Sequence, residues 1–145
     1  MKRIRGCAIV VHKEKVLLIR RKRVGVDEYF VFPGGGQEMD ESLEQTAVRE
    51  ALEETSLVVS VKKLLYHFTD ERSEHNFYLC SYISGEPKLG IGSGESLRAS
   101  ESNRYEPVWE NISDIANIPL VPEKVKNWFL KDVQNNFTDC PRIED

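Results

Sequence analysis

The stretch FPGGGQEMDESLEQTAVREALEETSL, residues 32–57, decides the fold of this 145-residue chain. Pro33 removes a backbone hydrogen-bond donor, and the three glycines after it allow backbone angles that are closed to other residues. The apolar run before Pro33 should therefore stop there. A tight, irregular loop is expected to follow it.

A helix is predicted after this loop. Asp40 or Ser42 can cap it, and Gln45 stands three residues beyond Ser42, as in a capping box. The helix is expected to run to about Thr55. At about 100° per residue, one face is apolar and should pack, while the other presents charge outward: Ala47, Val48, Ala51 and Leu52 against Arg49, Glu50, Glu53 and Glu54.

Outside this stretch, apolar runs between polar turns predict strands on both sides of the helix. The predicted strands cover residues 4–11, 16–19, 29–32, 57–66, 77–83 and 105–110. Residues 85–104 are expected to form a long loop, and a second helix should begin at Pro122. These elements indicate one α/β domain over residues 1–145, with a frayed tail from about residue 135.

Composition excludes several classes of protein. Twenty Lys and Arg against 24 Asp and Glu give a net charge of −4, so no overall field attracts nucleic acid or an anionic membrane. Cys7, Cys80 and Cys140 are far apart and lack the spacing of a zinc site or a disulfide framework. No apolar stretch is long enough to span a membrane. We therefore expect a cytoplasmic protein with reduced thiols and no membrane partner.

Three carboxylates carry the first functional signal. Glu50, Glu53 and Glu54 stand at i, i+3 and i+4, so on a helix they converge and repel one another. Pairing of Arg49 with Glu53 would explain them without any function. The glycine-rich loop favours a metal site instead, because exposed carbonyls and carboxylates suit a hard cation such as Mg²⁺. Such a site points to hydrolysis of a phosphoanhydride by water, with no covalent nucleophile.

Residues 35–57 resemble the Nudix box, G-x5-E-x7-R-E-U-x-E-E-x-G-U, in which U is a bulky aliphatic residue. Ala51 is small where the pattern has an aliphatic residue, and Ser56 replaces the last glycine. Neither departure removes a ligand. The matching positions are Gly35, Glu41, Arg49, Glu50, Glu53, Glu54 and Leu57.

The resemblance implies a mixed β-sheet sandwiched between α-helices, and it assigns roles by position. Glu53 and Glu54 would ligate Mg²⁺ or Mn²⁺, with the Gly34 carbonyl as a further ligand. Glu50 would ligate the metal or orient the attacking water. A later loop acid would complete the site or act as general base, for which we prefer Glu95 to Glu101. The implied supporting residues are Gly35, Glu41 and Arg49.

The resemblance also implies the reaction: metal-dependent cleavage of a nucleoside diphosphate linked to another group, including a nucleoside triphosphate or a damaged nucleotide. Arg20 and Arg21, in the basic run 20–23, are weaker candidates for phosphate binding and otherwise form a solvated strand end. Two alternatives stay open, an RNA 5′-end pyrophosphohydrolase that uses this run and a non-catalytic regulatory module that binds nucleotides. Many relatives pair as dimers, so a homodimer is also an expectation of the resemblance.

Overall fold

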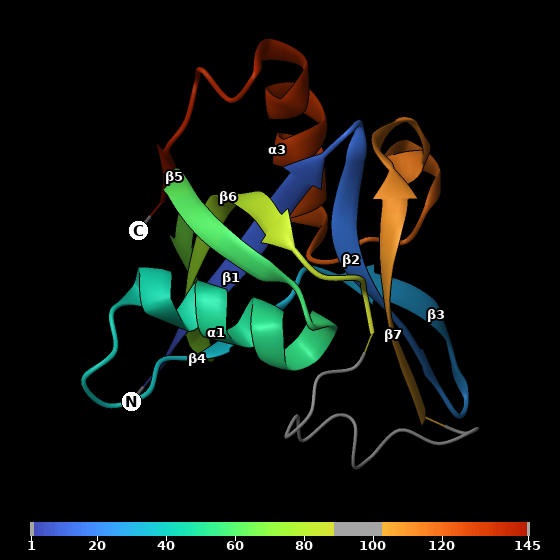
Figure 1. Ribbon diagram of the computed structural model, residues 1–145, viewed down its shortest axis with the longest axis horizontal. Helices are drawn as coiled ribbons and strands as arrows, with labels where there is room; N and C mark the ends of the chain where they lie inside the picture. The colour runs from blue at the N-terminus through green and yellow to red at the C-terminus, as the bar shows by residue number, and fades with distance from the viewer. Residues whose placement is uncertain (1, 89–102, 145) are drawn as a thin grey trace.

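The computed structural model describes residues 2–88 and 103–144 (Figure 1). Strands precede and follow the first long helix, and a second long helix comes after them, as the sequence predicts. The strands are β1 (Arg3–His12), β2 (Lys15–Arg23), β3 (Val26–Val31), β4 (Gly34–Gly36), β5 (Val58–Thr69), β6 (Ser73–Ser84), β7 (Asn103–Asn111) and β8 (Arg142–Ile143). The helices are α1 (Leu43–Thr55), α3 (Glu123–Asp132) and the short 3-10 turns η1 (Ile112–Asn117) and η2 (Val133–Asn135).

The eight strands form one mixed sheet in the order β3-β2-β1-β6-β5-β8, with β4 paired to β1 and β7 paired to β2. β1 runs parallel to β6 and antiparallel to β2 and β4. The pairing between β1 and β2 covers only Val11 with Val16 and His12 with Lys15. Towards its start, β1 pairs with β4 instead. The two strands therefore diverge, and this divergence makes room for a cleft.

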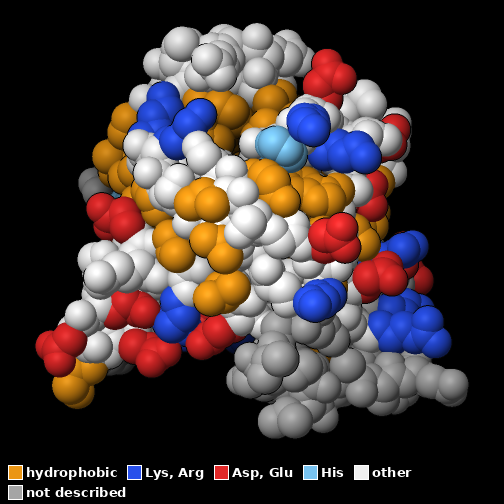
Figure 2. All heavy atoms as spheres, in the orientation of Figure 1, with side chains coloured by type: hydrophobic (Ala, Val, Ile, Leu, Met, Phe, Trp, Pro, Cys, Tyr) orange, Lys and Arg blue, Asp and Glu red, His pale blue; other side chains and the backbone are white. Residues whose placement is uncertain are grey.

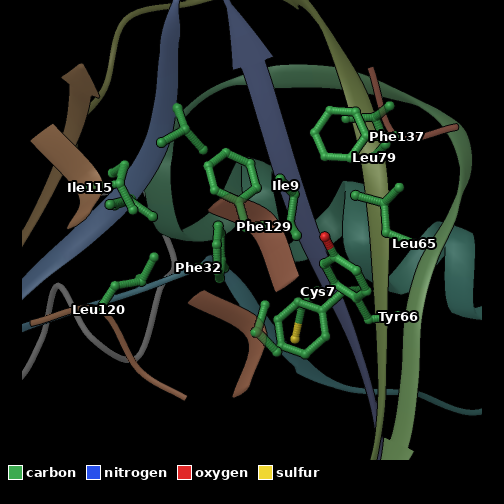
Figure 3. Packing of buried hydrophobic residues seen from close by; sticks show 14 of the residues in the cluster. Cys7, Ile9, Phe32, Leu65, Tyr66, Leu79, Ile115, Leu120, Phe129 and Phe137 are labelled. Carbon is green, nitrogen blue, oxygen red and sulfur yellow. The ribbon is translucent and has the colours of Figure 1, made fainter. Parts of the chain in front are cut away.

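Alternation along β1 builds a core on each side of the sheet. Cys7 and Ile9 join Phe129 of α3 in one cluster, whereas Ala8 and Val10 join Ala47 of α1 in the other. Figure 1 shows α1 and α3 on different sides of β1, and Figure 3 shows Ile9 close to Phe129 in the first cluster. The expectation of a mixed sheet between helices is confirmed.

Helix α1 begins as predicted but packs differently. Ser42 caps it with a complete capping box to Gln45, which decides between the two candidate caps. Ala47 and Ala51 are fully buried, but Leu52, expected on the packed face, is 48% exposed. Glu54 is 8% exposed instead, because the end of the helix turns this side chain towards β4.

Two other local expectations were wrong. Gly34–Gly36 form strand β4 rather than an irregular loop, because residues without side chains can lie directly against β1. The tail expected to fray from about residue 135 is packed: Phe137 is 3% exposed, and β8 pairs with β5. Asp132 holds this tail through Arg142, at 2.6 and 2.9 Å.

Cys7, Cys80 and Cys140 form no disulfide with one another. None of the helices within residues 2–88 and 103–144 has the length and apolar character needed to cross a membrane.

Candidate active site

Arg49 lies at the centre of the acidic residues of α1 and organises them. Its Nη1 atom donates to Glu50 Oε1 at 2.6 Å and to Glu53 Oε2 at 3.0 Å. The pairing with Glu53 that the sequence suggested is therefore present, but it is one contact of several. Glu38, in the loop before the helix, also lies 3.1 Å from Nη1. On the face drawn in Figure 2, acidic side chains crowd together where α1 and this loop lie in Figure 1.

Glu41 fixes the guanidinium from the other side. Arg49 Nε donates to one carboxylate oxygen at 2.7 Å and Nη2 donates to the other at 3.1 Å. The Thr46 hydroxyl also donates to Glu41, at 2.7 Å. The hydrogen bonds from Arg49, helped by Thr46, lower the pKa of Glu41 to about 2. Glu41 is therefore ionised at neutral pH and holds Arg49 in place.

Two glycines of β4 bring the backbone against the catalytic candidates of α1. The Gly34 N–H donates to Glu54 Oε1 at 2.8 Å. A Cβ atom on Gly35 would stand 2.5 Å from the carboxyl carbon of Glu50, so only glycine lets Glu50 lie there. Strand β4 thus positions two of the three predicted acids.

Glu54 and Gly34 also line a cleft of about 310 Å³ where β1 and β2 diverge. Burial raises the pKa of Cys7, in its wall, to about 12, so this residue is a neutral thiol at ordinary pH. A cysteine nucleophile is therefore not available at this position. The other lining residues are Arg5, Arg21, Val31, Phe32, His75, Phe77, Val121 and Pro122.

The two candidate phosphate-binding residues of β2 lie on opposite faces, as neighbours on a strand do. The Arg21 side chain lines the cleft, where it donates to the Tyr105 hydroxyl at 2.6 Å. Arg20 is on the other face, paired with Glu28 at 2.7 Å and Glu106 at 3.1 Å. The structure therefore brings Arg21 but not Arg20 to the predicted acids, and the basic run is not one continuous patch.

Sequence reasoning missed Arg5. It lines the same cleft from β1, and the Nε atoms of Arg5 and Arg21 are buried with no hydrogen-bond partner among the described residues. An unpaired buried donor costs about 1–3 kcal/mol, so a ligand that supplies acceptors would be favoured. The signal was available: by alternation Arg5 shares a face of β1 with Cys7 and Ile9, which is an unusual place for a charge.

Within residues 2–88 and 103–144, no group of three or more His, Cys, Asp or Glu side chains is arranged as a ready metal cluster. Glu50 and Glu53 contact Arg49, and Glu54 contacts the backbone of Gly34. The donor chemistry still fits a hard divalent cation, because the carboxylates of Glu50 and Glu54 lie against Gly35 and Gly34 of β4, where no side chain intervenes. The predicted loop acid, Glu95, and its alternative Glu101 lie outside the described residues.

Comparison with known proteins gives a consistent result. A model of the NUDIX domain matches residues 2–129. The uncharacterized Nudix hydrolase YvcI of Bacillus subtilis (strain 168) is 26% identical over 99% of this chain and 90% of its own length. An ADP-ribose pyrophosphatase of Methanocaldococcus jannaschii is 34% identical over 61% of this chain and 56% of its own length. In a solved structure, a NUDIX hydrolase from Nitrosomonas europaea has a TM-score of 0.71 at 18% identity, over 99% of this chain and 76% of that one, a likeness of fold.

Proposed function

The chain belongs to the NUDIX domain family and is a hydrolase of phosphoanhydride bonds, and from this premise we propose that it cleaves a nucleoside diphosphate linked to another group with the help of Mg²⁺. Mn²⁺ is the alternative metal. The proposal assigns metal binding to Glu53, Glu54, Glu50 and the Gly34 carbonyl. Glu95 remains the predicted general base.

One observation carries this proposal: Glu54 of α1 and Gly34 of β4 stand in the wall of a cleft that also holds two arginines. A divalent cation bound there would neutralise phosphate oxygens and lower the pKa of an attacking water. Arg49 and Gly35 hold Glu50 beside the other acids, where its carboxylate can ligate the cation or orient that water. Glu41 supports Arg49 in this arrangement.

The substrate is tested with a panel assayed with Mg²⁺, with Mn²⁺ and with EDTA. It holds nucleoside triphosphates, oxidised nucleotides, nucleotide sugars, ADP-ribose, dinucleoside polyphosphates and 5′-triphosphorylated RNA. We expect release of phosphate or pyrophosphate from one class of small nucleotide, and none in EDTA. Turnover of RNA alone would contradict the proposed substrate class, and tight ligand binding without any turnover would indicate a regulatory module.

The ligand assignment is tested by Glu53→Gln, since this side chain is 41% exposed and its change should spare the fold. We expect kcat/KM to fall by at least about 100-fold, beyond the range typical of residues that only support a ligand. Glu44→Gln, the same change in the first turn of α1, is the control. Equal activities of the two variants would refute the assignment. In the same assay, loss in Glu95→Gln but not in Glu101→Gln would identify the loop acid.

A further inference from the structure

We propose that Arg5 and Arg21 form an anion subsite, which holds the second phosphate of the substrate's diphosphate while the first lies at the acidic residues of α1. The inference rests on the proposed function, because that function supplies a substrate with two adjacent phosphates. It adds a residue that no motif marks, Arg5, and gives each phosphate its own place.

The charges of the cleft favour an anion. Arg5 and Arg21 reach it from diverging strands, and their buried Nε–H groups have no acceptor within the described part of the chain. A guanidinium only donates hydrogen bonds, so its partner must bring acceptors, and phosphate oxygens match its fork. Among the described lining residues, Glu54 is the one carboxylate, and its Oε1 already accepts from the Gly34 N–H.

Arg21 is held ready for such a partner. Its guanidinium carbon lies 4.3 Å from the centre of the Tyr105 ring and 5.6 Å from that of Tyr29. The hydrogen bond to the Tyr105 hydroxyl adds a fixed direction. Because this side chain is ordered before any ligand arrives, little conformational entropy is lost on binding.

The aromatic residues of the cleft do not favour a nucleobase in this place. Phe32 and Phe77 are 5% and 3% exposed and pack edge to face at 5.8 Å. The His75 ring is stacked on Phe68 at 4.7 Å, and its Nε2 lies 2.8 Å from Asp70. These rings already pack against other aromatic rings of the protein. The cleft therefore offers positive charge rather than a free ring face on which a base could stack.

The test is calorimetric titration of the full chain with inorganic pyrophosphate in EDTA, where no cation links the ligand to the acids. We expect binding that weakens at least about 10-fold in Arg5→Gln and in Arg21→Gln. Lys22→Gln, which removes one positive charge from the same strand but on the face of Arg20, should bind as the wild type does. Adenosine and guanosine, which carry no phosphate, should not compete.

Arg5→Lys and Arg21→Lys keep the positive charge and are the controls for loss of the fold. They should bind pyrophosphate with intermediate affinity and unfold at the wild-type temperature. Unchanged pyrophosphate affinity in both glutamine variants would overturn the subsite, as would absence of binding to the wild type. Nucleoside binding that depends on the arginines would also overturn it, in favour of a base pocket. The titration is done in EDTA, where no turnover is expected, so its result does not depend on hydrolysis. A protein that binds pyrophosphate through the two arginines but hydrolyses no substrate of the panel would refute the proposed function and still support the anion subsite.

Discussion

Gly34, Gly35 and Gly36 of β4 have different neighbours, so substitution by alanine has a different effect at each of them. A Cβ atom on Gly34 would stand 2.8 Å from Cys7 Cβ and 2.9 Å from its Cα, so the backbone would have to move. On Gly35 its nearest neighbours would be the carboxylate atoms of Glu50, which can swing away. On Gly36 it would meet the Nε of Arg3 at 2.8 Å, the end of a flexible side chain. Alanine at Gly34 therefore strains the backbone, whereas alanine at Gly35 or Gly36 displaces a side chain.

We predict that Gly34→Ala lowers the free energy of unfolding by about 1–3 kcal/mol, as overpacking of a close contact does. Gly35→Ala should keep most of the stability but lower kcat about 100-fold, because Glu50 loses its position. Gly36→Ala is the matched control and should change neither. Denaturant unfolding and steady-state kinetics of the three variants decide the matter. If Gly35→Ala were as active as Gly36→Ala, the placement of Glu50 would have no catalytic weight.

For the helices and strands, the sequence predicted local features such as helix caps, but it did not predict which surfaces pack together. Ser42 and Gln45 form the capping box of α1, and their spacing in the sequence predicts where the helix begins. Helical periodicity could not tell that Leu52 would stay exposed, because a stripe of apolar residues does not say which part of it the sheet covers. The Nudix-like pattern marked the acids of α1, but Arg5 lies far from it in sequence and reaches the cleft only because β1 and β2 diverge.

The C-terminal tail, which the sequence predicted to be frayed, is another case in which packing could not be predicted. No periodic pattern links Asp132 to Arg142, yet the side chain of Asp132 is fully buried and accepts from Arg142 and from the Tyr66 hydroxyl. Burial raises the pKa of Asp132, but these hydrogen bonds outweigh it and leave the pKa below its usual value. Asp132 thus stays charged inside the protein and depends on Arg142 for compensation.

We predict that Arg142→Met lowers the free energy of unfolding by about 3–5 kcal/mol, the usual effect of leaving a buried charge unpaired. Glu144→Gln, which breaks the exposed ion pair with Lys124, should cost only about 0–1 kcal/mol. Since the fold lowers the pKa of Asp132, the contribution of its pair is present above about pH 4 and fades as the carboxyl is protonated below that value. The difference between wild type and Arg142→Met in denaturant unfolding should shrink accordingly. Equal costs of the two variants at pH 7 would contradict the role of the buried pair.

For the whole molecule, the acidic face is a source of instability that a cation can relieve. Four carboxylates, those of Glu38, Glu41, Glu50 and Glu53, contact the single guanidinium of Arg49. The chain as a whole carries a net charge of −4, so no general excess of positive charge offsets them. These contacts require α1 to be folded and the loop before it to be in place. A cation that binds there must therefore bind the native state in preference to the unfolded chain.

We predict that Mg²⁺ raises the unfolding temperature of the whole domain. A ligand at 100 times its Kd stabilises the native state by about 2.7 kcal/mol, and each kcal/mol corresponds to a few degrees in a domain of this size. The measurement is thermal unfolding with and without MgCl₂, with NaCl at matched ionic strength to account for screening. Glu53→Gln should lose most of the gain, whereas Glu44→Gln should keep it. A gain that NaCl reproduces would indicate screening of the acidic face rather than a bound cation. A gain that survives Glu53→Gln unchanged would mean that the cation binds away from these carboxylates, because Mg²⁺ bound at any site of the native state stabilises the fold.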